Sequence, residues 1–228
     1  MRDEVSSRWD RTNARLRMAN GKLNLLFSSE SRFMNRKTLH VIALSGSLRK
    51  ASTNTALLRA AQQLAPQGMV LEIVELGDLP FYNEDVERAG MPAAVAALSD
   101  KVRRADAVLL ATPEYNFSFS GVLKNALDWL SRPTSASPLA GKPAGIVGAG
   151  AGFGTARAQA HLRQVCQALD MLTLNKPEVL VTQTWTRFDA QGQLTDAPTR
   201  EVLSGFMNRF GEWIERHAQA NQLKEVEA

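Results

Sequence analysis

From Leu39 the sequence reads Leu39-His-Val-Ile-Ala-Leu-Ser-Gly-Ser-Leu-Arg-Lys-Ala-Ser-Thr-Asn54. Residues 39–44 form an apolar run rich in branched side chains, which predicts a buried strand. The segment 53–64 has apolar residues at helical spacing, so a polar loop joins a strand to the start of a helix. Unpaired backbone N–H groups and the helix dipole make such a helix start a site for an anion.

The same alternation of strand and helix continues along the chain. It predicts a three-layer α/β/α fold around a five-stranded parallel sheet. The doubly wound strand order 2-1-3-4-5 places the first and third strands side by side, so the loops after them become neighbours. The expected strands are 39–44, 70–76, 107–111, 144–147 and 178–181, and the expected helices are 53–64, 92–104, 121–131, 155–169 and 199–217.

Composition restricts the possible function classes. The 228 residues, 44% hydrophobic and 22% charged, fit one well-buried core. Residues 1–40 hold nine basic and four acidic side chains, whereas the other 188 hold 18 basic and 19 acidic ones. The net charge of +4 therefore comes from the N-terminal segment, and bulk charge gives no case for nucleic-acid binding. No apolar run approaches the roughly 18–20 residues that span a bilayer, so we expect no membrane association.

Cysteine and histidine usage leads to two further expectations. Cys166 is the only cysteine, which excludes an internal disulfide and suits the reducing cytoplasm. The three histidines lie far apart without metal-ligand spacing, so we expect no metal site.

Both ends of the chain lie outside the predicted domain, which spans residues 38–218. The composition of residues 1–37 predicts an unstructured extension. Alternatively, the translation start is placed too early and Met34 is the functional start. A targeting or partner-binding role is the alternative, although the acidic residues Asp3, Glu4 and Asp10 do not fit a transit peptide. Residues 219–228 are expected to be a C-terminal tail.

Three loops after strands carry the candidate chemistry. The first, Ser45–Asn54, offers hydroxyl, amide and guanidinium donors without a negative charge, which favours a phosphate ligand over a plain helix-capping turn. It lacks the Gly-Lys-Ser/Thr ending of a Walker loop and the three spaced glycines of a dinucleotide fingerprint.

The second loop is Thr112-Pro-Glu-Tyr-Asn-Phe-Ser-Phe-Ser-Gly121. Its three aromatic side chains and its Asn116 amide favour a planar ligand over a turn that only packs on the core. The third loop, Gly148-Ala-Gly-Ala-Gly-Phe-Gly154, permits close approach of a ligand to the backbone, with a flexible lid as the alternative interpretation.

These stretches together resemble the NAD(P)H-dependent FMN reductase family, and most of all its bacterial quinone and chromate reductases. The resemblance extends from about residue 38 to about residue 218. It rests on Gly46-Ser-Leu-Arg-Lys-x-Ser-x-Asn54, Pro113-Glu-Tyr-Asn116, Gly121-x-Leu-Lys-Asn-Ala-x-Asp-Trp-Leu-Ser-Arg132 and Ala140-Gly-Lys-Pro143.

The resemblance implies a flavodoxin-like fold that holds FMN without a covalent bond. The residues expected to bind the FMN phosphate are Ser47, Arg49, Ser52 and Asn54, with Thr55 beside them. Those expected to line the flavin ring are Pro113, Glu114, Tyr115, Asn116 and Phe117 on one side and Gly148, Gly150 and Gly152 on the other.

It also implies a homodimer or homotetramer, in which Arg157 and Glu178 take part in polar contacts between subunits. Phe117 and Ala160 stand where the chromate-reducing branch commonly has tyrosines. This sequence therefore lacks the hydroxyl groups that such tyrosines bring to the network.

The implied activity is oxidoreduction. Hydride passes from NADPH or NADH to bound FMN and two electrons then pass to a small acceptor, a quinone or also chromate, an azo compound or free flavin. No side chain is expected to act as a catalytic acid or base, because the chemistry belongs to the cofactor. The alternatives are a flavodoxin-like electron carrier and a redox-sensing binding protein, neither of which turns over a pyridine nucleotide.

Overall fold

The computed structural model describes residues 38–227, and the side chains of residues 38–220. The predicted extension 1–37 lies outside the described residues. In the part of the chain that is described, no helix combines the length and the apolar character needed to cross a membrane.

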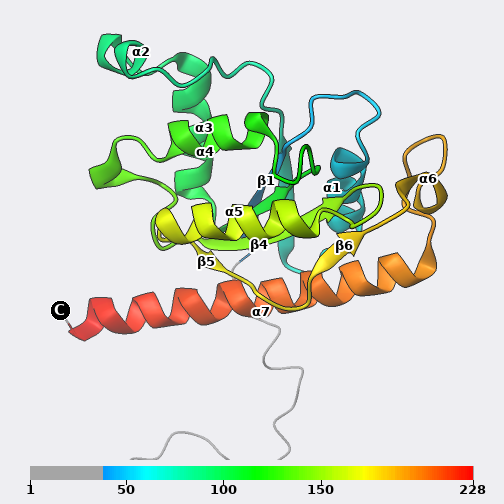
Figure 1. Cartoon of the computed structure of the whole chain (residues 1–228). Coiled ribbons are helices and arrows are strands. Elements are labelled where there is room, and N and C mark those ends of the chain that lie inside the picture. The colour runs from blue at the N-terminus through cyan, green and yellow to red at the C-terminus, as the bar shows by residue number, and fades with distance from the viewer. Residues whose placement is uncertain (1–37, 228) are drawn as a thin grey trace, which may run out of the picture. The chain divides into compact units, whose positions relative to one another are not determined.

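A parallel sheet with the order β2-β1-β3-β4-β5 forms the centre of the molecule, which confirms the predicted strand order (Figure 1). Its strands are β1 (Leu39–Ser45), β2 (Met69–Val74), β3 (Ala107–Ala111), β4 (Pro143–Ala149) and β5 (Leu172–Thr173). Every residue of β3 and β4 is buried, as expected for central strands covered on both faces.

The edge beside β4 is divided between two short strands, where the sequence predicts one. β5 pairs with the beginning of β4, and β6 (Val179–Val181) pairs with its end, Val147–Ala149. The predicted strand 178–181 corresponds to β6, and β5 was not predicted. Two residues are too few to show the alternation or apolar run by which a strand is recognised.

Helices cover both faces of the sheet. They are α1 (Thr53–Gln63), α2 (Glu84–Ala89), α3 (Ala93–Arg104), α4 (Gly121–Leu130), α5 (Ala156–Ala168), α6 (Thr184–Arg187) and α7 (Ala197–Glu227), with a 3-10 turn, η2, at Thr134–Ala136. The five predicted helices correspond to α1, α3, α4, α5 and α7. The α7 helix is longer than predicted and continues into the segment expected to be a tail.

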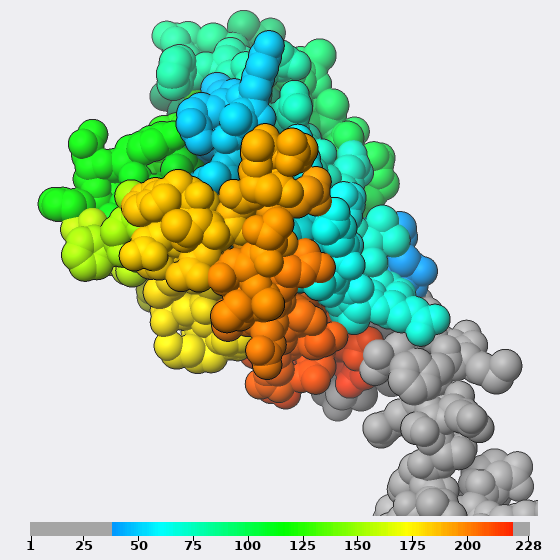
Figure 2. Space-filling model, turned by 90° about the vertical axis from the view of Figure 1, so that its right-hand side faces the viewer, coloured from blue at the N-terminus to red at the C-terminus, as the bar shows by residue number. Residues whose placement is uncertain are grey.

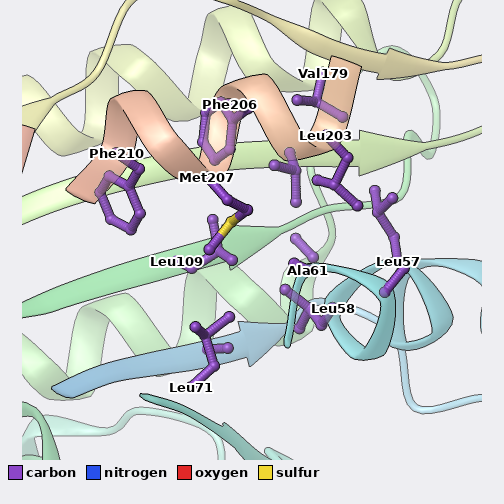
Figure 3. Close-up of a cluster of buried hydrophobic side chains, with 14 of the residues drawn as sticks. Leu57, Leu58, Ala61, Leu71, Leu109, Val179, Leu203, Phe206, Met207 and Phe210 are labelled. Atoms are coloured by element: carbon purple, nitrogen blue, oxygen red, sulfur yellow. The ribbon is translucent and has the colours of Figure 1, made fainter. Parts of the chain in front are cut away.

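Two hydrophobic clusters, one on each face of the sheet, form the core. One cluster joins α1 and α7 to the sheet through large buried residues such as Leu57, Phe206 and Phe210 (Figure 3). The other joins α3, α4 and α5 to the opposite face, with Leu98, Leu127 and Leu162 among its members. The segment after α6 also packs beside α1 (Figure 2). The Gln63 and Gln193 side chains hydrogen-bond there at 3.4 Å.

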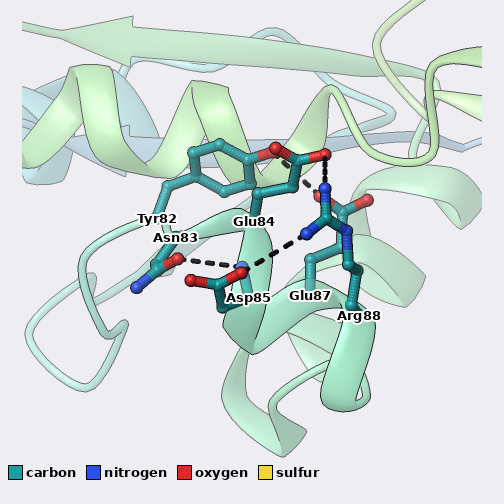
Figure 4. A network of polar contacts seen from close by, with 6 residues as sticks. All are labelled: Tyr82, Asn83, Glu84, Asp85, Glu87 and Arg88. Carbon is teal, nitrogen blue, oxygen red and sulfur yellow. Dashed lines mark hydrogen bonds and ion pairs between the residues drawn. The ribbon is translucent and has the colours of Figure 1, made fainter.

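The unpredicted helix α2 projects from the α3–α4 side and buries none of its residues (Figure 1). Local polar contacts hold it instead: Asn83 caps its first turn through Asp85 N–H at 2.9 Å, and Arg88 pairs with Glu84 at 2.7 Å (Figure 4). Tyr82 donates its hydroxyl to Glu87 at 2.9 Å. A six-residue helix stabilised in this way has no apolar stripe, so hydrophobic periodicity could not reveal it.

We expect Gly145→Val to lower stability by about 1–3 kcal/mol, because a side chain here overpacks the core. A Cβ on Gly145 would lie 3.0 Å from the side chains of Leu109 and Phe206. Thermal unfolding followed by circular dichroism measures the effect. Gly205→Ala on α7, where a Cβ meets no atom within 4 Å, is the control and should leave the melting temperature equal or higher. Equal melting of Gly145→Val and the wild type would contradict this packing.

Candidate cofactor site

The candidate site lies where β1, β3 and β4 end. These strands are parallel and adjacent, with Ser45 opposite Ala111 and Ala111 opposite Val147. Their carboxyl ends therefore meet at one edge of the sheet, and the three predicted loops follow from that edge. Gly46 shows how close the first two loops lie, because a Cβ there would approach the Ser120 hydroxyl to 2.7 Å.

The first loop ends in a capped helix. Ser52 is the N-cap of α1, and its hydroxyl accepts from the Thr55 N–H at 3.2 Å. The Ser45 and Thr55 hydroxyls hydrogen-bond at 2.9 Å, which joins the end of β1 to the first turn of the helix. Ser52 is buried, so this hydroxyl is a structural cap as well as a candidate phosphate ligand.

The surroundings of this helix start suit an anion. The first turn of α1 contains no acidic residue, and its first N–H groups have no partner within the helix. Arg49 and Lys50 are exposed on the preceding turn, where one Arg49 nitrogen donates to Ala51 O at 3.0 Å. Ser47 lies between them and β1. The predicted residues Ser47, Arg49, Ser52 and Thr55 thus lie within one short turn and its helix.

Asn54 has a role that sequence reasoning missed. Its side chain is buried, donates to Ala149 O at 2.9 Å and accepts from Ala149 N–H at 2.9 Å. The amide thus ties the first turn of α1 to the end of β4 with one of its two N–H donors. The two residues are 95 positions apart, so nothing local in the sequence indicates the contact.

The second loop contains a tight turn with two residues in left-handed conformation. Tyr115 and Ser118 exchange backbone hydrogen bonds of 2.9 and 3.0 Å across Asn116 (φ 48°) and Phe117 (φ 67°). Asparagine tolerates this region, but a bulky aromatic residue rarely occupies it. The turn leaves the Tyr115 and Phe117 side chains more than half exposed at the end of β3.

The third loop uses its glycines for close packing rather than for general flexibility. A Cβ on Gly148 would overlap the Thr155 hydroxyl, and one on Gly154 (φ 56°) would lie 2.7 Å from the backbone of Leu180. The Gly150 N–H donates to Val181 O at 2.9 Å, which fixes the loop to β6. Gly152 differs, because a Cβ there meets no atom within 4 Å.

Glu114 joins the second loop to α5. Its Oε1 accepts from Arg157 Nε at 2.7 Å and lies 2.5 Å from Nη2 of the same guanidinium. Its Oε2 accepts from the backbone N–H groups of Arg157 (3.0 Å) and Ala158 (3.2 Å). Burial of Glu114 opposes its ionisation. The hydrogen bonds from Ala158 and Arg157 and the positive charge of Arg157 outweigh the effect of burial and lower the pKa of Glu114. The side chain is therefore a carboxylate at neutral pH.

Two aromatic rings complete this cluster. The Arg157 guanidinium carbon lies 3.8 Å from the ring centre of Phe117 and 4.5 Å from that of Phe153, which are cation–π contacts. Arg157 thereby links the second loop to the third. Sequence reasoning placed Arg157 at a subunit contact and did not single out Phe153 as a site residue, although Phe153 is the one aromatic residue in the glycine-rich loop.

A cleft of about 430 Å³ lies between the second and third loops. Four predicted residues line it, Glu114, Asn116, Phe117 and Gly152, whereas Pro113, Tyr115, Gly148 and Gly150 lie in the same loops without lining it. The further lining residues are Ala151, Phe153, Thr155 and Arg157. Glu178 lies elsewhere and pairs with Lys176 at 2.8 Å.

Backbone, amide and aromatic groups line this cleft, and the start of α1, which has no acidic residue in its first turn, lies at the same sheet edge. A planar ring with a phosphate tail fits this combination.

Comparison with known proteins identifies the family. Residues 39–186 match the model of the NADPH-dependent FMN reductase family. The chain belongs to this family. It is 50% identical over 179 residues to an NAD(P)H-dependent FMN reductase of Pseudomonas aeruginosa, covering 78% of this chain and 96% of that protein. It is 41% identical over 177 residues to a 2-hydroxy-1,4-benzoquinone reductase of a Burkholderia species, covering 77% and 96%.

A solved structure extends the comparison to the fold. FerB, a flavoenzyme NAD(P)H:(acceptor) oxidoreductase from Paracoccus denitrificans, superposes with a TM-score of 0.72 at 37% identity. The match covers 78% of this chain and 98% of FerB. The flavodoxin-like arrangement expected of an FMN reductase family member is therefore confirmed.

We expect Asn54→Ala to lower the free energy of unfolding by about 1–3 kcal/mol, because it leaves the buried N–H and C=O of Ala149 without their partner. Chemical denaturation measures this change. Gln63→Ala, which removes an exposed side chain from the same helix, is the control and should change stability by less than about 0.5 kcal/mol. Equal effects of the two substitutions would show that the Asn54 contact is not important for stability.

Proposed function

We propose that this FMN reductase family member is an NAD(P)H:quinone oxidoreductase that works through non-covalently bound FMN. The observation that carries the proposal is the adjacency of an acid-free helix start and an aromatic, amide-bearing cleft at one sheet edge. Relatives named as an FMN reductase and a benzoquinone reductase support the same activity.

The residues present fit FMN in two parts. Ser47, Arg49, Ser52, Asn54 and Thr55, with the first N–H groups of α1, would hold the phosphate. The backbone and side chains of residues 113–117 and the glycines at 148, 150 and 152 would border the ring. Bound there, FMN supplies hydride acceptance from NAD(P)H and two-electron transfer to the quinone.

The chain's own residues would bind and orient the flavin and shield it from water. The N–H groups in the two loops can donate to the polar edge of a flavin and stabilise the negative charge that its reduction brings. The left-handed turn at Asn116 and Phe117 sets the position of that edge. Four N–H groups contact the Glu114 carboxylate: the backbone N–H of Arg157 and of Ala158, and two from the Arg157 guanidinium. Glu114 is therefore a structural carboxylate rather than a free base.

We further propose that the active form is a homodimer or homotetramer. Arg157 and Glu178, which the family resemblance assigns to subunit contacts, do not pair with each other within one chain. About 40% of each side chain remains exposed, so both are accessible to a second copy.

We propose a cytoplasmic location, because Cys166 is the only cysteine in the sequence and so cannot form an internal disulfide, which suits a reducing compartment. This thiol is buried, and burial, opposed by the charge of Arg163, raises its pKa to about 12. It is therefore an inert apolar residue that has no part in a disulfide or in redox chemistry.

Arg49→Ala should weaken FMN binding at least tenfold, because a charge-assisted contact to phosphate contributes about 1.5–3 kcal/mol. Quenching of FMN fluorescence on titration with apoprotein gives the dissociation constant. Arg59→Ala, an exposed arginine farther along α1, is the control and should bind FMN as the wild type does. An Arg49→Ala protein with unchanged affinity would remove Arg49 from the phosphate site.

The oxidoreductase activity is tested by stopped-flow spectroscopy of the FMN-loaded protein. We expect NADPH or NADH to bleach the flavin absorbance, and 1,4-benzoquinone to restore it. If dithionite reduces the FMN-loaded protein but neither pyridine nucleotide does, the protein is an electron carrier or a binding protein instead.

A further inference from the structure

The candidate ring cleft contains one pair of opposite charges. Of its lining residues in the described part of the chain, only Glu114 and Arg157 are charged. They differ in environment: the Glu114 side chain is 10% exposed, whereas that of Arg157 is 40% exposed. Each is also fixed, Glu114 by the first turn of α5 and Arg157 by the rings of Phe117 and Phe153.

Fixed charges in a cleft act on any group that changes its own charge there. Reduction places additional negative charge on a flavin ring, so a cation beside the ring favours reduced FMN and an anion favours oxidised FMN. The partly water-excluded surroundings strengthen both effects relative to bulk water. The ion pair itself is neutral, so the two effects oppose each other.

We propose that Glu114 and Arg157 set the reduction potential of FMN in this cleft, with Arg157 raising it and Glu114 lowering it. The inference rests on the proposed function. It adds that this pair of charges determines which electron acceptors the reduced FMN can reduce. A higher potential favours uptake of hydride from the nucleotide, and a lower potential favours transfer of electrons to weaker oxidants.

A purely structural role for the pair predicts a different result. If Glu114 and Arg157 only hold the second and third loops together, removal of either one loosens the same contact. Both substitutions would then change FMN binding and potential in the same direction. Electrostatic tuning instead predicts shifts of opposite sign, with compensation when both charges are removed.

The experiment is measurement of the FMN midpoint potential by equilibration with reference dyes at saturating FMN. We expect Glu114→Gln to raise the potential and Arg157→Met to lower it, with the double substitution close to wild type. A tenfold change in the preference for reduced over oxidised FMN corresponds to about 30 mV for a two-electron couple, and we expect shifts of at least that size. The Arg157→Met measurement is made on the alkaline side of neutrality, where Glu114 without its partner is ionised.

Two further variants separate charge from geometry. Arg157→Lys keeps the charge but loses the planar contact with two rings, so its potential should stay near wild type. Lys124→Met breaks the exposed pair with Asp128 on α4, which does not line the cleft, and should leave the potential unchanged. Thermal melts establish that each variant is folded; if Arg157→Met does not fold, Glu114→Gln compared with Arg157→Lys still measures the effect of one charge.

Shifts of the same sign in Glu114→Gln and Arg157→Met, or potentials equal to wild type, would overturn the inference. That failure differs from failure of the proposed function, which would already appear as wild-type protein that binds no FMN or is not reduced by either nucleotide.

Discussion

The two hydrogen bonds between the Asn54 side chain and the backbone of Ala149 hold the site together. Parallel pairing of β1, β3 and β4 brings three loops to one edge of the sheet, but pairing alone leaves the loops free above that edge. Asn54 joins the helix that follows the first loop to the strand that precedes the third. The phosphate end and the ring end of the proposed cofactor site are thereby kept at a constant separation, which is the condition for one ligand to occupy both.

A second link joins the remaining loop. Glu114 accepts hydrogen bonds from α5 and Arg157, and Arg157 lies between aromatic rings of the second and third loops. The glycines at 148 and 154 permit this arrangement because a side chain at either position would collide with Thr155 or Leu180. The second and third loops are thus positioned by direct contacts with each other and with α5.

The parts of this picture that the sequence predicts are those encoded locally. The apolar run 39–44, the helical spacing after Asn54 and the fully apolar strand 107–111 each reveal their element without knowledge of the rest of the chain. The doubly wound order then follows from general rules for parallel sheets. By contrast, the helices α2 and α6 and the strand β5 are too short to carry a periodic pattern.

Contacts within the candidate site are predictable only in part, for a different reason. The motifs locate the loops, but Asn54 meets Ala149 across 95 residues, and Glu114 meets Arg157 across 43. The sequence therefore did not reveal the Asn54–Ala149 contact or the part that Phe153 takes in the cluster, because spacing along the chain does not show which side chains pack together in space.

A crystal structure of the protein with FMN tests most directly whether one ligand occupies both parts of the site. The account predicts the phosphate at the first N–H groups of α1 beside Arg49, and the ring in the cleft bordered by Glu114 and Gly152. A phosphate bound away from α1, or a ring outside that cleft, would contradict it.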